Sequence, residues 1–179
     1  MRATLKFLAL AFAVAAQLVA VASASAQTAA FESKAKQVYL VEAATGTLLY
    51  AKNADEIIPP ASLAKLMTAE YVFNELKQGR ITQDTLYKVS EYSWRTGGAL
   101  SRTSTMFAAL NSEIRVGDLL RGVIVQLAND GCMILAEGLA GSDEAFAELL
   151  TKRAREIGLE TSVFANSSGL PNPANKTTV

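Results

Sequence analysis

The sequence predicts a mixed α/β fold of the α+β kind, in which one β-hairpin is followed mainly by helices. Two β-rich runs, residues 38–41 and 47–50, flank a turn that contains Gly46. Apolar residues then recur at helical spacing after residue 60 and again within 116–139 and 142–158. A two-stranded hairpin is marginally stable alone, so the sheet that should accompany these helices is predicted to be incomplete.

The first helix is expected to begin just after Pro59-Pro60, which no strand tolerates, and to end at Gly79. Ser62 and Lys65 stand three residues apart near its start, so they share one face. The apolar residues assigned to the same stripe are Leu66, Ala69, Val72, Phe73 and Leu76. Lys65 is therefore predicted to lie on the buried side of the helix.

The remaining elements follow in order. Residues 80–113 are predicted to be loops with short elements, and 116–127 a buried helix that ends at the breaker Asn129-Asp130-Gly131. A further helix is expected over 132–139. Another begins after Ser142, a typical N-cap residue, and runs to Gly158, whereas residues 159–175 are rich in turns.

The composition excludes several kinds of site. The 179 residues contain 17 basic and 17 acidic side chains, no histidine and one cysteine. Without histidine there is no imidazole base and no imidazole metal ligand. One cysteine forbids an internal disulfide or a cysteine-rich metal site, and Cys132 is expected to be a small buried apolar residue. The charge balance argues against nucleic acid as a partner.

The N-terminus has the pattern of a secretory signal peptide. Arg2 and Lys6 precede an apolar stretch, and the small residues Ala24-Ser25-Ala26 fit a cleavage site. The alternative is a membrane anchor, but Gln17 and the small residues after it make a weak span. Residues 1–26 are thus predicted to be removed near Ala26, and the mature protein to be exported to the periplasm or cell envelope.

Without histidine, a nucleophile must be paired with lysine or a carboxylate. Ser62 and Lys65 offer such a pair. Burial lowers the pKa of a lysine, and a neutral amine beside a hydroxyl can accept its proton. The helix N-terminus adds positive potential near Ser62. The alternative is structural, with Ser62 as a helix cap and Lys65 extending its amine to water.

The segment Pro60-Ala61-Ser62-Leu63-Ala64-Lys65 resembles the serine-type D-alanyl-D-alanine carboxypeptidases, the low-molecular-mass penicillin-binding proteins of the peptidase S11 family. The resemblance extends over most of the chain. Its other stretches are Tyr39–Gly46, Lys52–Asp55, Asp118–Gly122, Asn129–Cys132, Ala140–Ser142 and Phe164–Leu170.

The resemblance implies a DD-peptidase/β-lactamase-like fold, an antiparallel sheet with a helical subdomain. It implies that Ser62 is the nucleophile, Lys65 its general base and Asn129 a residue that contacts the substrate amide and helps to orient the lysine. The substrates would be peptidoglycan stem peptides ending in D-Ala-D-Ala, and β-lactams would acylate the same serine. No metal or organic cofactor is implied.

Two departures from the family pattern concern catalysis. Leu127 occupies the serine position of the S-x-N motif, and an isobutyl group cannot relay a proton to the leaving amine. If that relay matters as general-acid catalysis usually does, its loss raises the barrier by roughly 2–4 kcal/mol. The K-T-G motif, whose lysine would bind the substrate carboxylate, is absent. Lys176-Thr177-Thr178 is similar in sequence but is not that motif, because it follows too closely on Gly169-Leu170.

The absence of the K-T-G motif and of the strands expected with it predicts that residues 27–179 are the N-terminal part of a catalytic domain, cut before its K-T-G strand. Membrane contact is then expected only through a missing C-terminal region. Two other functions stay open: a non-catalytic relative that binds wall peptides or penicillin without turnover, and a β-lactamase. The β-lactamase would need an S-D-N triad and a glutamate-bearing loop, which the sequence lacks.

Overall fold

The computed structural model describes residues 31–179. The chain divides after Lys36 into two compact units, and the unit Gln37–Val179 contains all the helices and strands described here. The signal peptide predicted over residues 1–26 lies outside the described residues. Within 31–179, no helix combines the length and the apolar character that crossing a bilayer requires.

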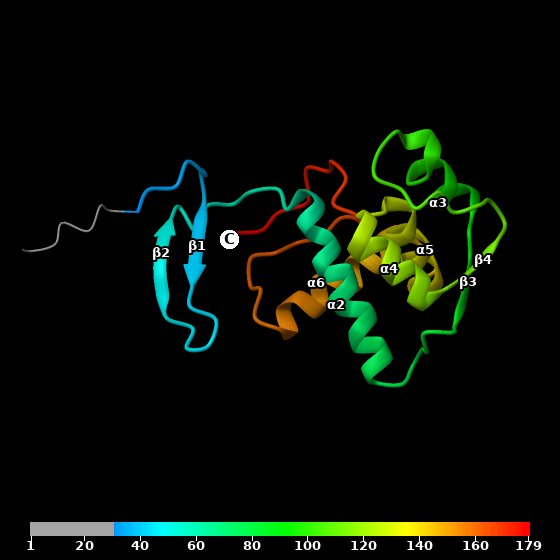
Figure 1. The fold of residues 1–179 in the computed structure, drawn as a ribbon, viewed down its shortest axis with the longest axis horizontal. Helices are drawn as coiled ribbons and strands as arrows, with labels where there is room; N and C mark the ends of the chain where they lie inside the picture. The colour runs from blue at the N-terminus through cyan, green and yellow to red at the C-terminus, as the bar shows by residue number, and fades with distance from the viewer. Residues whose placement is uncertain (1–30) are drawn as a thin grey trace, which may run out of the picture. The chain divides into compact units, whose positions relative to one another are not determined.

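The predicted hairpin is present. Strand β1 (Val38–Val41) pairs antiparallel with β2 (Leu48–Lys52) (Figure 1). The carboxylate of Glu42 accepts the backbone N–H of Thr45 at 2.6 Å, and Gly46 takes a positive φ of 70° to close the turn. Among the described strands, β1 and β2 pair only with each other. Their exposed apolar side chains are Tyr39, Leu40, Val41, Leu48 and Leu49.

The helix predicted after the two prolines begins with a 3₁₀ turn, η1 (Ala61–Leu63), that continues into α2 (Ala64–Lys77). Gly79 follows with a φ of 68°, as expected of a residue that ends a helix. The predicted apolar stripe is partly wrong, because Leu66 and Phe73 are 70% and 51% exposed. Successive helical positions lie about 100° apart, so packing that buries Lys65 can leave its neighbour exposed.

Short elements occupy the region predicted to be loops. Strands β3 (Leu86–Lys88) and β4 (Glu113–Arg115) form a second two-stranded antiparallel sheet. Between them lie α3 (Glu91–Thr96) and the 3₁₀ turn η2 (Ala99–Ser101). The described strands thus form two separate small sheets, which confirms a mixed α/β fold with antiparallel pairing.

The break between the next two helices differs from the prediction. Helix α4 (Val116–Gln126) stops at Leu127, which takes a left-handed φ of 55°, and α5 (Asn129–Ala140) begins two residues later. The expected breaker is therefore the first turn of α5. Asp130 makes this possible, since its carboxylate accepts the N–H of Gly131 at a helix start where backbone N–H groups lack partners.

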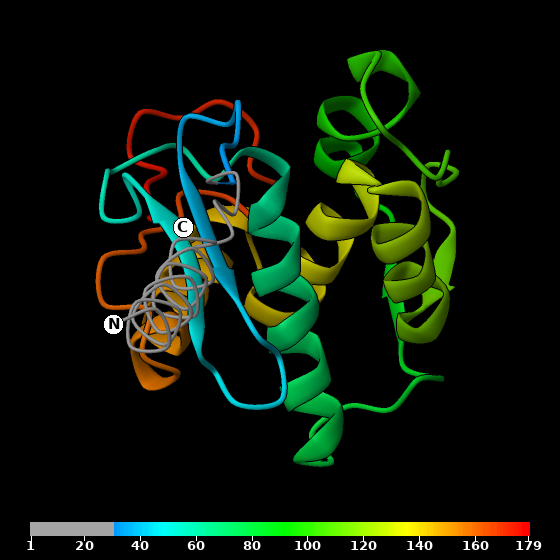
Figure 2. The ribbon, with the colours of Figure 1, turned by 60° about the vertical axis from the view of Figure 1, so that its left-hand side comes forward.

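Helix α5 is the centre of the helical part. It contacts α2, α3 and α4, as well as α6 (Asp143–Glu156) (Figure 2). The consecutive residues 132–136 are all buried, which is typical of a helix covered on every side. Cys132 is among them, as predicted. Ser142 caps α6, also as predicted, by accepting the N–H of Ala145 at 3.1 Å.

Two apolar clusters hold α2 in place. One joins it to α4 and α5 through Val72, Val123 and Leu135. The other joins it to α6 through Met67 and Phe146. Each fully buried side chain of this size stabilises the fold by about 1.5–3 kcal/mol relative to exposure. The N-terminal half of α2, which carries Ser62 and Lys65, is thereby fixed on a packed base.

Candidate active site

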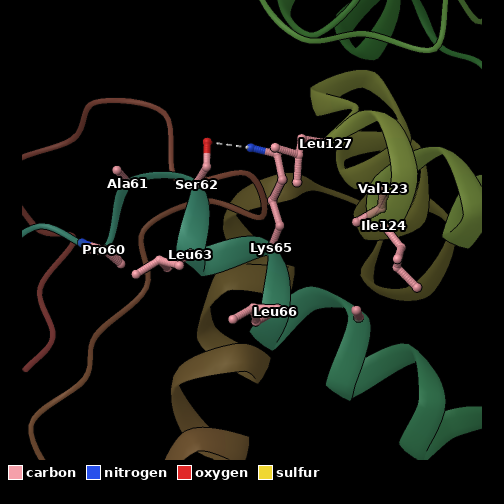
Figure 3. Close-up of a pocket in the computed structure, with 10 residues that line it drawn as sticks. Pro60, Ala61, Ser62, Leu63, Lys65, Leu66, Val123, Ile124 and Leu127 are labelled. Atoms are coloured by element: carbon pink, nitrogen blue, oxygen red, sulfur yellow. Dashed lines mark hydrogen bonds between the residues drawn. The ribbon is translucent and has the colours of Figure 1, made fainter. Parts of the chain in front are cut away.

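Ser62 and Lys65 meet at the start of α2. Ser62 lies in η1, where its side chain is exposed, and Lys65 lies one helical turn later, where it is 4% exposed. The Nζ of Lys65 is 3.2 Å from the Oγ of Ser62 (Figure 3). The structure therefore brings the two residues together and buries the lysine, as the sequence analysis expects.

A second oxygen holds the Lys65 amine from a distant part of the chain. Nζ donates to the backbone carbonyl of Ser168 at 2.7 Å. The neighbouring carbonyl, that of Ser167, accepts the hydroxyl of Thr68 at 2.6 Å. The stretch Phe164–Leu170, which includes Ser168, resembles the family in sequence, but every residue type has a backbone carbonyl, so the sequence does not predict this contact.

Burial lowers the pKa of Lys65 from its ordinary value of 10.5, because desolvation disfavours the charged amine. A thiolate at Cys132 would oppose this shift. Burial, however, raises the pKa of Cys132 to about 12, so the thiol is neutral near pH 7 and desolvation dominates. A lysine with a lowered pKa, touching a serine hydroxyl, has the properties of a general base.

A pocket of about 480 Å³ opens beside the pair. Ser62 and Lys65 supply its polar groups, while Val123, Ile124 and Leu127 line it from α4 and its C-cap (Figure 3). Leu127 is 48% exposed, so it is not the ordinary core residue that an apolar helix end would suggest. The side chain at the expected proton-relay position is therefore an apolar part of the pocket wall.

Asn129 is buried at the first turn of α5, with 4% of its surface exposed. Its Nδ2 donates to the hydroxyl of Thr103 at 2.8 Å, and its backbone N–H donates to the carbonyl of Ser104 at 2.9 Å. Its Oδ1 accepts no hydrogen bond from the described residues. The Lys65 amine donates to Ser62 and Ser168 and makes no hydrogen bond to Asn129. Asn129 therefore does not orient the lysine through a direct hydrogen bond in this structure.

Asp130 binds the loop that precedes β4 and packs against the first turn of α5. Its carboxylate accepts the hydroxyl of Thr105 at 2.7 Å, together with the N–H groups of Met106 at 3.0 Å and Ala108 at 3.1 Å. Asp130 itself is fully buried. A buried carboxylate needs such donors, and each donor would be costly to leave unpaired. Asp130 thereby holds the loop to which Asn129 is bonded.

No cluster suited to a metal ion is found among residues 31–179, because nowhere do three cysteine or carboxylate side chains gather. The polar groups of the pocket are a hydroxyl and an amine rather than metal ligands. The chemistry this arrangement can perform is activation of the Ser62 hydroxyl by Lys65 and attack on an electrophile in the adjoining pocket.

Comparison with known proteins identifies relatives of this chain. The family described as D-alanyl-D-alanine carboxypeptidase, peptidase S11, matches residues 21–179. D-alanyl-D-alanine carboxypeptidase DacC of Escherichia coli is 39% identical over 140 residues, which are 78% of this chain and 35% of DacC. DacF of Bacillus subtilis is 33% identical over 144 residues, which are 80% of this chain and 36% of DacF. The chain thus spans about a third of the length of these relatives.

Solved structures agree with the sequence matches. Penicillin-binding protein 5 from Haemophilus influenzae superposes with a TM-score of 0.77 at 34% identity, covering 83% of this chain and 42% of that one. The D-alanyl-D-alanine carboxypeptidase DacD from Francisella tularensis gives the same TM-score and identity, covering 83% and 35%. The fold is therefore that of the DD-peptidases and penicillin-binding proteins, as the sequence predicts.

Proposed function

The chain belongs to the peptidase S11 family of D-alanyl-D-alanine carboxypeptidases, and on that premise we propose that it carries the acylation site of a serine-type D-Ala-D-Ala carboxypeptidase. The substrates are peptidoglycan stem peptides that end in D-Ala-D-Ala. Ser62 is the nucleophile and Lys65 its general base. The single observation that supports this most strongly is the contact between the Ser62 hydroxyl and a buried lysine whose pKa is lowered.

The reaction follows from this pair. The neutral Lys65 amine takes the proton of the Ser62 hydroxyl while Oγ attacks the carbonyl carbon of the penultimate D-alanine. The peptide bond breaks, and the terminal D-alanine leaves as its amine after receiving the proton that Lys65 took from Ser62, so Lys65 is neutral again and an ester to Ser62 remains. Water then attacks this ester while Lys65 takes a proton from it and passes the proton to the Oγ of Ser62, which releases the shortened peptide and the free serine.

The position of Ser62 favours stabilisation of the negative charge that forms during attack. Ser62 stands at the start of the η1–α2 helical segment, where the backbone N–H groups and the helix dipole provide positive potential. We assign to Asn129 the contact with the substrate amide that the family resemblance implies. Its Oδ1 is without a partner among the described residues but is buried, so the side chain must turn towards the pocket, whose wall includes Leu127 two residues earlier, to accept the substrate N–H.

β-Lactams are the second class of ligand. Their strained amide would acylate Ser62 by the same steps, and the ester would persist because the ring fragment stays attached. The predicted signal peptide and a cell-wall substrate agree with export, so we place the mature protein in the periplasm or cell envelope.

Two measurements on the full protein test this function: labelling by a fluorescent penicillin, and D-alanine release from diacetyl-lysyl-D-Ala-D-Ala. Ser62→Ala should abolish both, whereas Ser112→Ala, which removes a hydroxyl bonded only to its own turn, should leave both unchanged. Stable labelling without D-alanine release would instead identify a penicillin-binding relative that does not turn over. Labelling that survives Ser62→Ala would refute the assignment of the nucleophile.

A further inference from the structure

The turn Asn166–Leu170 approaches both residues of the acylation site. Its Ser168 carbonyl accepts the Lys65 amine. The side chain of Asn166 locks the turn, because Oδ1 accepts the N–H of Gly169 at 2.7 Å and Nδ2 donates to the carbonyl of Leu170 at 3.0 Å. The turn is therefore a small rigid unit with one contact to the base.

A second side of the turn lies against the residue before the nucleophile. Gly169 has a φ of 77°, and a Cβ built on it would stand 1.7 Å from the carbonyl oxygen of Ala61 and 2.5 Å from its carbonyl carbon. Such distances are impossible for a real side chain next to backbone. The absence of a side chain at 169 is thus what allows the two backbone segments to touch.

Ala61 itself is in the left-handed region, with a φ of 47°. Alanine populates this region poorly, so the surrounding contacts must hold it there. The carbonyl of Ala61 contacts Gly169, and the next residue is Ser62. The conformation of Ala61 determines the direction in which the chain enters η1, and hence where the Ser62 hydroxyl stands relative to Lys65.

We propose that Gly169 is a positioning residue of the acylation site. It fixes Ala61, and through Ala61 the position of Ser62 relative to the Lys65 amine, while the neighbouring Ser168 carbonyl accepts a hydrogen bond from that amine. This inference rests on the proposed function, since it concerns the geometry of acylation. The turn fixes the nucleophile through residue 169 and the base through residue 168. A side chain at position 169 would push the two apart without touching the substrate.

The test compares Gly169→Ala with Gly79→Ala in the full protein. Gly79 has a similar φ of 68°, but a Cβ built there meets nothing within 4 Å. Both variants therefore carry the same kind of backbone strain, and only Gly169→Ala collides with Ala61. Acylation by a fluorescent penicillin should slow roughly 10- to 100-fold in Gly169→Ala and stay near wild type in Gly79→Ala.

The effect should fall on the rate constant of acylation at saturating penicillin rather than on the initial binding constant. The melting temperature of Gly169→Ala should drop further than that of Gly79→Ala, because the collision with Ala61 adds to the backbone strain that both variants share. Rates are therefore compared well below both melting temperatures, where a merely structural role of Gly169 would leave the acylation rate constant of the folded protein unchanged. Equal acylation rates in the two variants would overturn the positioning role alone. A wild-type protein that is not acylated at all would overturn the proposed function.

A second pair of variants covers the case in which Gly169→Ala does not fold. Asn166→Ala removes the side chain that locks the turn, whereas Asn172→Ala removes an asparagine that only accepts the N–H of Ala174 in an exposed turn. Acylation should slow in Asn166→Ala and not in Asn172→Ala. Equal rates in this pair would likewise contradict the inference.

Discussion

The amine nitrogen of Lys65 lies 2.7 Å from the carbonyl oxygen of Ser168, a residue 103 positions further along the chain. On its other side the amine lies 3.2 Å from the hydroxyl oxygen of Ser62. A carbonyl oxygen can only accept a hydrogen bond, so the amine must donate there whether it is charged or neutral. When it is neutral, its lone pair is left for the proton of Ser62.

The pH dependence of acylation should follow the titration of Lys65. Because burial lowers the pKa of this amine below 10.5, the rate of penicillin acylation should rise with pH and level off before the ordinary lysine range is reached. Lys65→Arg should cut the rate by roughly 10²–10⁴-fold, because a guanidinium stays charged and cannot act as the base. Lys77→Arg, on the exposed end of the same helix, is the matched control.

The same pKa shift affects stability. The unfolded chain keeps the lysine proton up to about the ordinary pKa, whereas the folded chain releases it at lower pH. Between the two values the unfolded state binds more protons, so the free energy of unfolding should rise with pH there. Denaturant titrations of wild type and Lys65→Met at several pH values would measure this. The same slope in both proteins would contradict it.

Leu127→Ser should restore the proton relay. The serine hydroxyl can carry a proton towards the leaving amine, so D-alanine release in the full protein should rise about tenfold or more. Val125→Ser, an exposed substitution near the end of the same helix, should have no effect. An unchanged rate in Leu127→Ser would refute the assignment of this position to the relay.

Leu127 also offers a test of backbone strain. It ends α4 with a φ of 55°, a conformation that glycine adopts more readily. Leu127→Gly should therefore raise the free energy of unfolding by about 1 kcal/mol. Val125→Gly, inside the helix, should lower it by roughly 0.5 kcal/mol. Chemical denaturation of both variants should show these opposite signs, and a loss of stability in both would contradict the strain.

Asp130 is expected to be the most costly acidic residue to replace. Asp130→Ala leaves the N–H groups of Met106, Ala108 and Gly131 without their acceptor, so the free energy of unfolding should fall by at least about 3 kcal/mol. Asp118→Ala removes only exposed ion pairs and should cost about 1 kcal/mol or less. Similar losses in the two variants would contradict a role of Asp130 in holding the loop.

Patterns within one or two helical turns were readable from the sequence. The hairpin around Gly46, the helix after Pro60 and the Ser142 cap all depend on neighbouring residues, and each is found in the structure. The predicted burial of Lys65 is found as well, although the apolar stripe that predicted it is wrong for Leu66 and Phe73. The ordered stretches that resemble the D-alanyl-D-alanine carboxypeptidases also predicted the family, which the match over residues 21–179 confirms.

Tertiary packing decided the rest. The sequence could not reveal that Leu66 is exposed, since that depends on which side of α2 other helices cover. The start of α5 at Asn129 depends on a loop that the Asp130 carboxylate holds. The partner of Lys65 is a backbone carbonyl, which every residue type possesses, and only the fold determines which carbonyl reaches the amine.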